Sequence, residues 1–444
     1  MRRVLYIAYI YPPCGGAGVQ RTAKFVRYLP DYGWLPTVLT VDPSCYGIQD
    51  ASQTQETPEG VEVVRTPNLD PVARFTYVRP AAQGTNGAAG SNGSGRGFIR
   101  GGVRRILKTG WLALEKNVLV PDPALLWYPR AVAAGQALLR RRHFDLICAT
   151  GEPYSAYLIA KTLATRAGLP FVIDMRDPWT MAPYRADKRA AWRTSLEAWQ
   201  ERRILAACRA CVFAFRHDDL YGAAFPEWTG KFHYIPNGYD SADFAGVEPR
   251  RFDKFTIVHS GTFLPGYRSA RPFLLALREL RMRRPDLASG AQVLFVGKLG
   301  EEGPLIQEFG LTDLVRQVGY LPHRESIRYL LGADLLLLVG GQHRWEETGK
   351  VYEYLATSKP ILALIHPEGS AARLLSACPG ARIVDREDAP AAAAALWETL
   401  DARTAPARSV CRDWVARFER RRLTASLATV FDAAWRDGRP GRTR

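Results

Sequence analysis

Charged residues follow an apolar run in the first half of the chain. The segment DMRDPW, residues 174–179, comes at the end of the run Phe171–Asp174, which we expect to be a buried strand. Ligands of α/β sheets bind at the carboxyl ends of the strands, so carboxylates and a guanidinium at this place are positioned for chemistry. The segment TGEPYS, residues 150–155, ends the preceding expected strand and should border the same cleft. The alternative interpretation is a structural network of ion pairs.

A second group of charged residues lies in the segment EETGKVYEYL, residues 346–355. A Gly-Lys step at the start of a helix presents backbone N–H groups and an ammonium, which together suit a diphosphate. Glu353 follows one turn later and is placed to accept hydrogen bonds from ribose hydroxyls. A plain amphipathic helix with a solvated Glu353 would have the same pattern.

A glycine-rich turn, YPPCGGAGVQR at residues 11–21, separates the first expected strand from a helix. Glycines let the backbone approach a ligand, and the helix N-terminus offers free N–H groups to an anion. The turn matches neither the dinucleotide fingerprint nor the GK[ST] phosphate loop. A tight structural turn would use glycines as well.

Short apolar runs alternate with helix-period segments along most of the chain. The expected strands are Val4–Tyr9, Thr37–Val41, Asp145–Ala149, Phe171–Asp174, Cys211–Phe215, Thr256–His259, Val293–Val296, Leu335–Val339 and Ile361–Leu364. Most are apolar throughout, as in parallel sheets covered on both faces. The alternation predicts doubly wound α/β units. A polar stretch, residues 241–254, separates two series of similar size, so we expect two α/β domains facing each other across a cleft.

The composition limits the function classes. Of 444 residues, 47% are hydrophobic, which excludes disorder as the overall state. The 60 Lys and Arg exceed the 44 Asp and Glu, and the net charge of +16 favours anionic partners. Nucleic acid is not expected among them, because the chain lacks RRM, KH and helix-turn-helix signatures and its charge is dispersed. Seven cysteines without framework spacing indicate a reduced, cytoplasmic compartment.

Two adjoining segments interrupt the α/β pattern. Residues 80–102 are rich in Gly, Ala, Ser and Asn and predict a flexible loop. Residues 98–116 then place apolar side chains, including Trp111, at helical spacing with arginines on other faces. This pattern is typical of a helix lying on an anionic membrane surface, here the inner face of the plasma membrane. The alternative is a helix that covers the sheet. No apolar run is long enough to span a bilayer.

The ordered motifs together resemble the retaining glycosyltransferase family four, in particular its bacterial branch for capsules, exopolysaccharides and lipid-linked oligosaccharides. They are YPPCGGAGVQR (11–21), RDPW (176–179), IPNGYD (235–240), HSGTF (259–263) and GKVYEYLA (349–356). The resemblance implies a GT-B fold of two Rossmann-like domains. It places an acceptor-binding domain at residues 1–240, a nucleotide-sugar-binding domain at 255–408, and a helix at 409–435 that crosses back to the first domain.

The resemblance also assigns roles to individual residues. Those implied at the donor are Gly16 and Gly18 beside the sugar phosphate, Arg268, Thr348, Gly349 and Lys350 at the diphosphate, Glu353 at the ribose and Tyr320 at the base. The catalytic candidates are Asp177, Arg176 and Glu346. The chain departs from the family where many members have a glutamate eight positions before Glu353, because Trp345 stands there. Which of Glu346 and Glu347 contacts the sugar therefore stays open.

The expected activity is transfer of a sugar from a nucleoside diphosphate sugar to a hydroxyl with retention of configuration. UDP and GDP are the expected nucleotides, and the expected acceptor is a glycan or a polyprenyl-diphosphate-linked sugar. No metal or further cofactor is expected, because no Asp-x-Asp segment suits Mg²⁺. The alternatives are a GT-B sugar-nucleotide epimerase and, from another class, a basic nucleic-acid-binding protein.

Overall fold

The computed structural model divides the chain into two compact units. Met1–Tyr234 with Ala425–Arg444 form the N-terminal unit, and Ile235–Thr424 form the C-terminal unit. The structure describes residues 1–15, 17–47, 49–50, 54, 56–69, 118–182, 190–264, 266–300, 302–401 and 412–438. The expected loop 80–102 and the segment 98–116 lie outside these residues.

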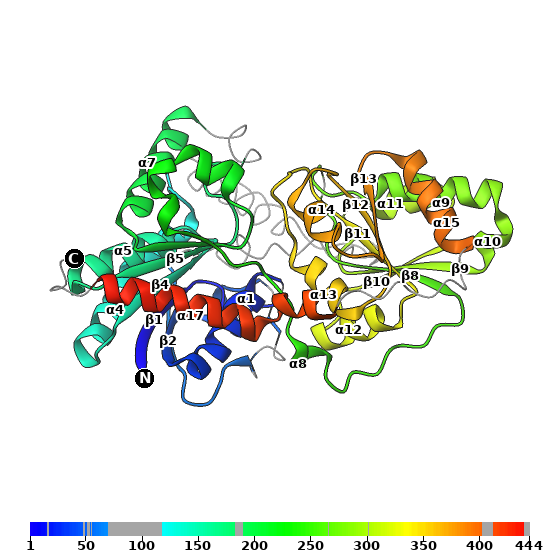
Figure 1. The fold of residues 1–444 in the computed structure, drawn as a ribbon. Helices are drawn as coiled ribbons and strands as arrows, with labels where there is room; N and C mark the ends of the chain where they lie inside the picture. Colours follow the sequence, from blue (N-terminus) through cyan, green and yellow to red (C-terminus); the bar gives the residue numbers. More distant parts are fainter. Residues whose placement is uncertain are drawn as a thin grey trace, which may run out of the picture. The chain divides into compact units, whose positions relative to one another are not determined.

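The N-terminal unit contains a seven-stranded parallel sheet in the order β3-β2-β1-β4-β5-β6-β7 (Figure 1). Its strands are β1 (Arg2–Ala8), β2 (Trp34–Val41), β3 (Glu62–Thr66), β4 (Leu146–Gly151), β5 (Phe171–Met175), β6 (Ala210–Phe213) and β7 (Phe232–Tyr234). Its longer helices are α1 (Ala17–Tyr28), α4 (Tyr128–Arg141), α5 (Ser155–Ala167), α7 (Ala191–Ala207) and α17 (Arg420–Asp437), of which the part from Ala425 onward belongs to this unit. The strand order reverses between β1 and β4, so the loops after these two strands flank the crevice where such sheets bind ligands.

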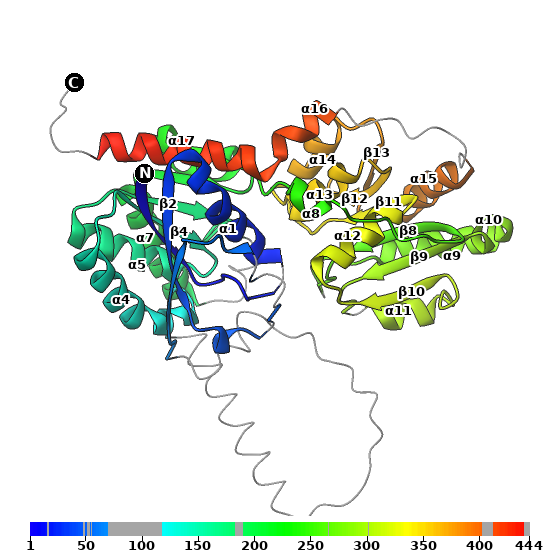
Figure 2. The same ribbon diagram turned by 90° about the horizontal axis from the view of Figure 1, so that it is seen from below.

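The last helix, α17, completes the N-terminal unit (Figures 1 and 2). Asp432 forms an ion pair with Arg2 at the start of β1 and accepts a 2.8 Å hydrogen bond from Trp34 Nε1. Phe431 packs edge-on against the Trp34 ring at 5.4 Å. The first and last elements of the unit are thus held together by apolar, polar and ionic contacts.

The C-terminal unit contains a six-stranded parallel sheet in the order β10-β9-β8-β11-β12-β13. Its strands are β8 (Phe255–Ser260), β9 (Ala291–Val296), β10 (Val315–Gly319), β11 (Leu335–Val339), β12 (Ile361–Ile365) and β13 (Ala381–Asp385). Its helices are α8 (Ser241–Phe244), α9 (Arg271–Arg283), α10 (Pro285–Ser289), α11 (Glu302–Glu308), α12 (His323–Gly332), α13 (Gly349–Thr357), α14 (Ser370–Leu375), α15 (Ala389–Asp401) and α16 (Arg412–Val415). Two hydrophobic clusters form its core, because alternate residues of the central strands point to opposite faces.

The observed sheets confirm the predicted α/β class with two parallel sheets. All nine expected strands are present, and the four unexpected ones, β3, β7, β10 and β13, are the edge strands of the two sheets. Among the described residues, no helix is both long enough and apolar enough to cross a membrane.

Candidate active site

The first turn of α13 places Lys350 over Gly261, which in turn lies against Gly297. The helix begins at Gly349, and no side chain caps its N-terminal N–H groups. Gly261 and Gly297 directly follow β8 and β9, and a Cβ on Gly261 would lie 2.8 Å from Lys350 Cε. Gly297 has φ +129°, and a Cβ there would lie 2.0 Å from the Gly261 carbonyl oxygen. Glycine is required at both positions, and the space it leaves holds the lysine side chain.

Lys350 is a half-buried cation without a counter-charge in contact. Within the described part of the chain, no carboxylate lies within ion-pair distance of its ammonium. Burial lowers the pKa of Lys350, and the nearby Glu353 opposes this effect. An ammonium beside uncapped helix N–H groups is an arrangement that binds anions such as a diphosphate.

The buried His259 faces the same glycine. Its Nδ1 donates a 2.9 Å hydrogen bond to the Leu337 carbonyl oxygen, so Nε2 carries the lone pair. Burial lowers the pKa of His259 to about 3, with smaller contributions from the charges of Lys350 and Arg268, so the ring is neutral at pH 7. The sequence motif contained His259, but it offered no sign that this imidazole would lie beside Lys350.

Glu346, in the loop before α13, forms an ion pair with Arg268, in the loop between β8 and α9. Tyr267 donates a 3.0 Å hydrogen bond to Glu346 Oε2, and the Gly341 backbone N–H donates another of 2.8 Å. Three groups therefore fix this carboxylate. The guanidinium predicted to face a diphosphate is paired with the carboxylate predicted to face the sugar, which leaves Lys350 as the uncompensated positive charge of this group.

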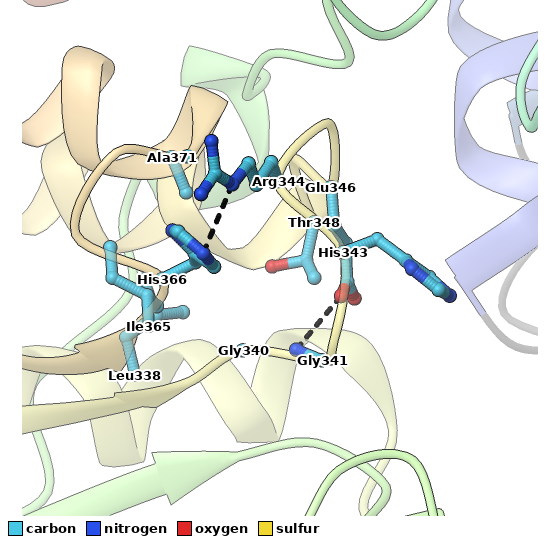
Figure 3. A pocket seen from close by; sticks show the side chains of 11 residues that line it. Leu338, Gly340, Gly341, His343, Arg344, Glu346, Thr348, Ile365, His366 and Ala371 are labelled. Carbon is cyan, nitrogen blue, oxygen red and sulfur yellow. Dashed lines mark hydrogen bonds between the residues drawn. The ribbon is translucent and has the colours of Figure 1, made fainter. Parts of the chain in front are cut away.

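Glu346 and Thr348 line an open pocket of about 330 Å³ at the carboxyl ends of β11 and β12 (Figure 3). Arg344 and His366 face each other across another part of its wall, with Arg344 Nε 3.1 Å from His366 Nε2. Glu347 points elsewhere, because its carboxylate is buried and accepts a 2.7 Å hydrogen bond from the Tyr352 hydroxyl. Of the two glutamates left open by the sequence, only Glu346 lines the pocket.

Glu353 lies in a small polar cluster that the sequence did not predict. His323, the first residue of α12, has its Nε2 3.9 Å from Glu353 Oε1 and 3.3 Å from Asp243 Oδ2. The described residues include no His, Cys, Asp and Glu group with the geometry of a metal site. Tyr320, predicted at the nucleotide base, follows β10 with 49% of its surface exposed.

In the N-terminal unit, Arg176 joins the loops that follow β1 and β4. Its guanidinium donates hydrogen bonds to the carbonyl oxygens of Gly18, Gly151 and Glu152. A Cβ on Gly18 would lie 3.0 Å from Arg176 Nη1, so glycine makes room for the guanidinium. Arg176 thus organises the backbone at the crevice of this sheet. Gly16, predicted beside the sugar phosphate together with Gly18, lies outside the described residues.

The two aspartates beside Arg176 have different environments. Asp174 is fully buried in β5, where it pairs with Arg21 of α1 at 2.7 Å and accepts a 3.0 Å hydrogen bond from Thr150. Asp174 therefore belongs to a structural network of ion pairs, which is the alternative interpretation of the segment 174–179. Asp177, the predicted polar group at the anomeric carbon, is only partly buried in the segment after β5.

Solved structures share this architecture across nearly the whole chain. Sucrose-phosphate synthase from Thermosynechococcus elongatus superposes with a TM-score of 0.64 at 15% identity, covering 97% of this chain and 98% of its own. Anabaena HepE in complex with UDP-glucose gives 0.60 at 13% identity, over 97% of this chain and 100% of its own. The fold is that of the GT-B glycosyltransferases.

The GT-B fold also occurs in another enzyme class among these structures. A putative UDP-N-acetylglucosamine 2-epimerase from Listeria monocytogenes gives a TM-score of 0.51 at 9% identity, over 96% of this chain and 94% of its own. No protein-family model and no curated protein sequence matches the chain. At these identities the likeness establishes the GT-B fold alone.

Proposed function

We propose that this protein is a retaining glycosyltransferase whose C-terminal unit binds a nucleoside diphosphate sugar. The observation that carries the proposal is Lys350, which lies at the uncapped start of α13, packs against Gly261 and has no carboxylate within ion-pair distance among the described residues. This arrangement suits a diphosphate, and the GT-B neighbour HepE was crystallised with UDP-glucose. UDP is therefore the first nucleotide to test, and GDP the second.

The surrounding residues fit the parts of such a donor. Lys350, Thr348 and the N–H groups of Gly349 and its neighbours would hold the diphosphate. Glu353, beside His323, would accept hydrogen bonds from the ribose hydroxyls. Glu346 would accept a hydrogen bond from a sugar hydroxyl, since three donors already orient its carboxylate. Arg268, its ion-pair partner, would partly neutralise the negative charge of this carboxylate. Tyr320 would cover the base.

The chemical step needs stabilisation of the negative charge that grows on the leaving diphosphate. Lys350 and the helix N–H groups supply it in a site of low polarity, where such interactions are strongest. In the N-terminal unit, which would bind the acceptor, Arg176 orders the backbone at Gly18, and Asp177 is the proposed polar group for the anomeric carbon. The chain provides the positive charge itself, so the proposal includes no metal.

The acceptor in this proposal is a hydroxyl of a glycan or of a polyprenyl-diphosphate-linked sugar in bacterial surface polysaccharide synthesis. The basic amphipathic segment 98–116 supports a membrane-bound acceptor. The variant Trp111→Glu should weaken binding to anionic vesicles, and unchanged binding would return the segment to a structural role.

Sugar transfer tests the main proposal directly. The protein is incubated with UDP-, GDP- and dTDP-sugars and acceptor mixtures, and the glycoside and free nucleotide are measured. Lys350→Ala, Glu353→Ala and Asp177→Ala should each lower turnover at least about a hundredfold, as loss of one transition-state contact does. Lys359→Ala, a lysine just beyond the end of α13, is the matched control and should leave turnover unchanged. Wild-type turnover in Lys350→Ala, Glu353→Ala and Asp177→Ala, as in the control, would refute the assignments.

A sugar-nucleotide epimerase is the second candidate. The observation that favours it is the grouping of His323, Asp243 and Glu353, which offers acid and base groups, on a fold that the Listeria structure shares. The products separate the two functions: an epimerase gives an epimerised sugar without a glycoside, whereas a transferase gives a glycoside and nucleoside diphosphate.

A further inference from the structure

As far as Glu201, helix α7 has the reverse of the usual arrangement of apolar and charged residues, whereas Ile204 and Leu205 near its end are buried in the usual way. Its inward face carries Arg193, Glu197 and Glu201, all at least 96% buried. Two tryptophans and a leucine are exposed instead: Trp192 by 52%, Leu196 by 36% and Trp199 by 54%. A helix stabilised only by its own unit would bury these apolar side chains.

The buried charges hold α7 in place from the inside. Arg193 pairs with Glu197 at 2.9 Å and donates to the Leu119 and Pro121 carbonyl oxygens. The Glu201 carboxylate accepts hydrogen bonds from the hydroxyls of Thr180 and Tyr221. These contacts fix the helix orientation, so the outward position of the tryptophans is built into the fold. Thr180 follows closely after Asp177, so α7 is anchored to the segment that carries a catalytic candidate.

The outward residues form one stripe along the helix. Positions 192, 196, 199 and 203 recur every three to four residues, so their side chains share one face for about 16 Å. The ten exposed residues of α7 are Ala191, Trp192, Ser195, Leu196, Ala198, Trp199, Arg202, Arg203, Ala206 and Ala207. None is acidic, and the stripe is therefore apolar and positive.

Two cations at one end of the stripe lack counter-charges. The Arg203 guanidinium lies 4.9 Å over the Trp199 ring. Helices α5 and α7 pack against each other, and burial, together with the charge of Arg203, lowers the pKa of Lys161 on α5. Neither forms an ion pair with a carboxylate in the described parts of the chain. An anionic partner would relieve this repulsion.

We propose that the outward face of α7 docks on an anionic lipid membrane, with Trp192, Leu196 and Trp199 entering the interface and Arg203 and Lys161 meeting lipid phosphates. Tryptophan prefers the boundary between headgroups and acyl chains, and each basic residue near an anionic surface adds attraction. A glycan fits less well, because Leu196 and the alanines offer no hydrogen bonds to sugar hydroxyls. A second copy fits less well, because a symmetric contact would bring the arginines together.

The inference rests on the proposed function only for the biological role of the docking, because membrane docking would bring the N-terminal unit to a lipid-linked acceptor. Its test needs no sugar substrate. Purified protein is sedimented with vesicles of phosphatidylcholine alone and with vesicles containing 30% phosphatidylglycerol, at low and high salt. Wild-type protein should bind the anionic vesicles and release at high salt.

Trp199→Glu should weaken this binding at least about tenfold, since it removes an interfacial tryptophan and adds a like charge to the anionic surface. Met282→Glu is the matched control, because Met282 is an exposed side chain on helix α9 and the charge change is identical. Arg203→Gln should reduce the salt dependence of vesicle binding, because it removes a positive charge and leaves both tryptophans in place. Circular dichroism and UDP-induced thermal shifts show that each variant is folded, and they test donor binding separately.

Equal vesicle binding by wild type, Trp199→Glu and Met282→Glu would overturn the proposal. So would loss of an oligomer, or of binding to a soluble glycan, in Trp199→Glu without a change in vesicle binding. Those results would assign the face to a second copy or to a sugar chain.

Discussion

At the scale of single residues, Lys350 combines a cost in stability with a use in binding. Its ammonium is partly removed from water by Gly261, His259 and α13, and no carboxylate lies within ion-pair distance of it among the described residues. Its pKa is lower folded than unfolded, so the unfolded chain binds more protons. The destabilisation is present below the folded pKa and is relieved as pH rises through it toward the unfolded value.

Replacing Lys350 by methionine should therefore have opposite effects on stability and binding. We expect the free energy of unfolding to rise by about 1 kcal/mol, because a desolvated charge is removed and the side-chain volume is largely kept. UDP affinity should fall at least about a hundredfold, the loss of a charge-assisted contact of about 3 kcal/mol. Urea unfolding and titration calorimetry measure the two quantities. Lys359→Met should change neither, and loss of both stability and affinity in Lys350→Met would contradict this account.

The lowered pKa of Lys350 also predicts the pH dependence of donor binding. Only the ammonium attracts a diphosphate, so affinity should decline as pH rises toward the folded pKa, which lies below the usual lysine value of about 10.4. Measurement of the UDP dissociation constant from pH 7 to 10 should show this decline. Lys350→Arg should abolish it, since arginine stays charged over this range. The same decline in the arginine variant would assign the titration to another group.

The local part of the candidate site could be predicted from sequence, and its long-range part could not. Lys350 and Glu353 lie on one helix, so their spacing alone places them on neighbouring turns. The pairing of Arg268 with Glu346, and of Glu353 with His323, joins residues far apart in the chain. A sequence shows which side chains are charged, but the fold decides which of them neutralise each other.

At the scale of elements, α1 and β5 are joined by the buried pair of Arg21 and Asp174. Asp174→Asn should lower the free energy of unfolding by about 3 kcal/mol, because it leaves the Arg21 guanidinium buried without its counter-charge. Thermal and urea unfolding measure the loss. The double variant Arg21→Met with Asp174→Leu should recover much of it, and a double variant as unstable as the single one would contradict the explanation.

The strands that sequence analysis missed share a physical cause. β3, β7, β10 and β13 lie at the sheet edges, where one side has no neighbouring strand. Polar residues such as Glu62, Arg316, Gln317 and Arg382 interrupt three of them, and β7 is only three residues long. The interior strands, buried on both faces, are continuous apolar runs and were predicted. Charged, short edges also discourage pairing with other molecules.

At the scale of the whole molecule, the chain folds into two compact units, each with its own buried hydrophobic residues. Scanning calorimetry should therefore resolve two unfolding transitions. UDP should raise only the transition of the C-terminal unit, since a ligand stabilises the fold that binds it. Asp174→Asn should lower only the midpoint temperature of the other transition and so assign it to the N-terminal unit. A single transition that is shifted both by UDP and by Asp174→Asn would show that the two units unfold together.

The position of α17 has a consequence for the order in which the protein folds during synthesis. Arg2 and Trp34 are synthesised long before their partners Phe431 and Asp432. The C-terminal unit is contained in one uninterrupted stretch, Ile235–Thr424, which ends within the first turns of α17. It is therefore translated before the rest of α17, Ala425–Asp437, which belongs to the N-terminal unit. The unit that is started first is thus completed after the other, and the flank of β1 and β2 that α17 contacts stays uncovered until this part of the helix is synthesised.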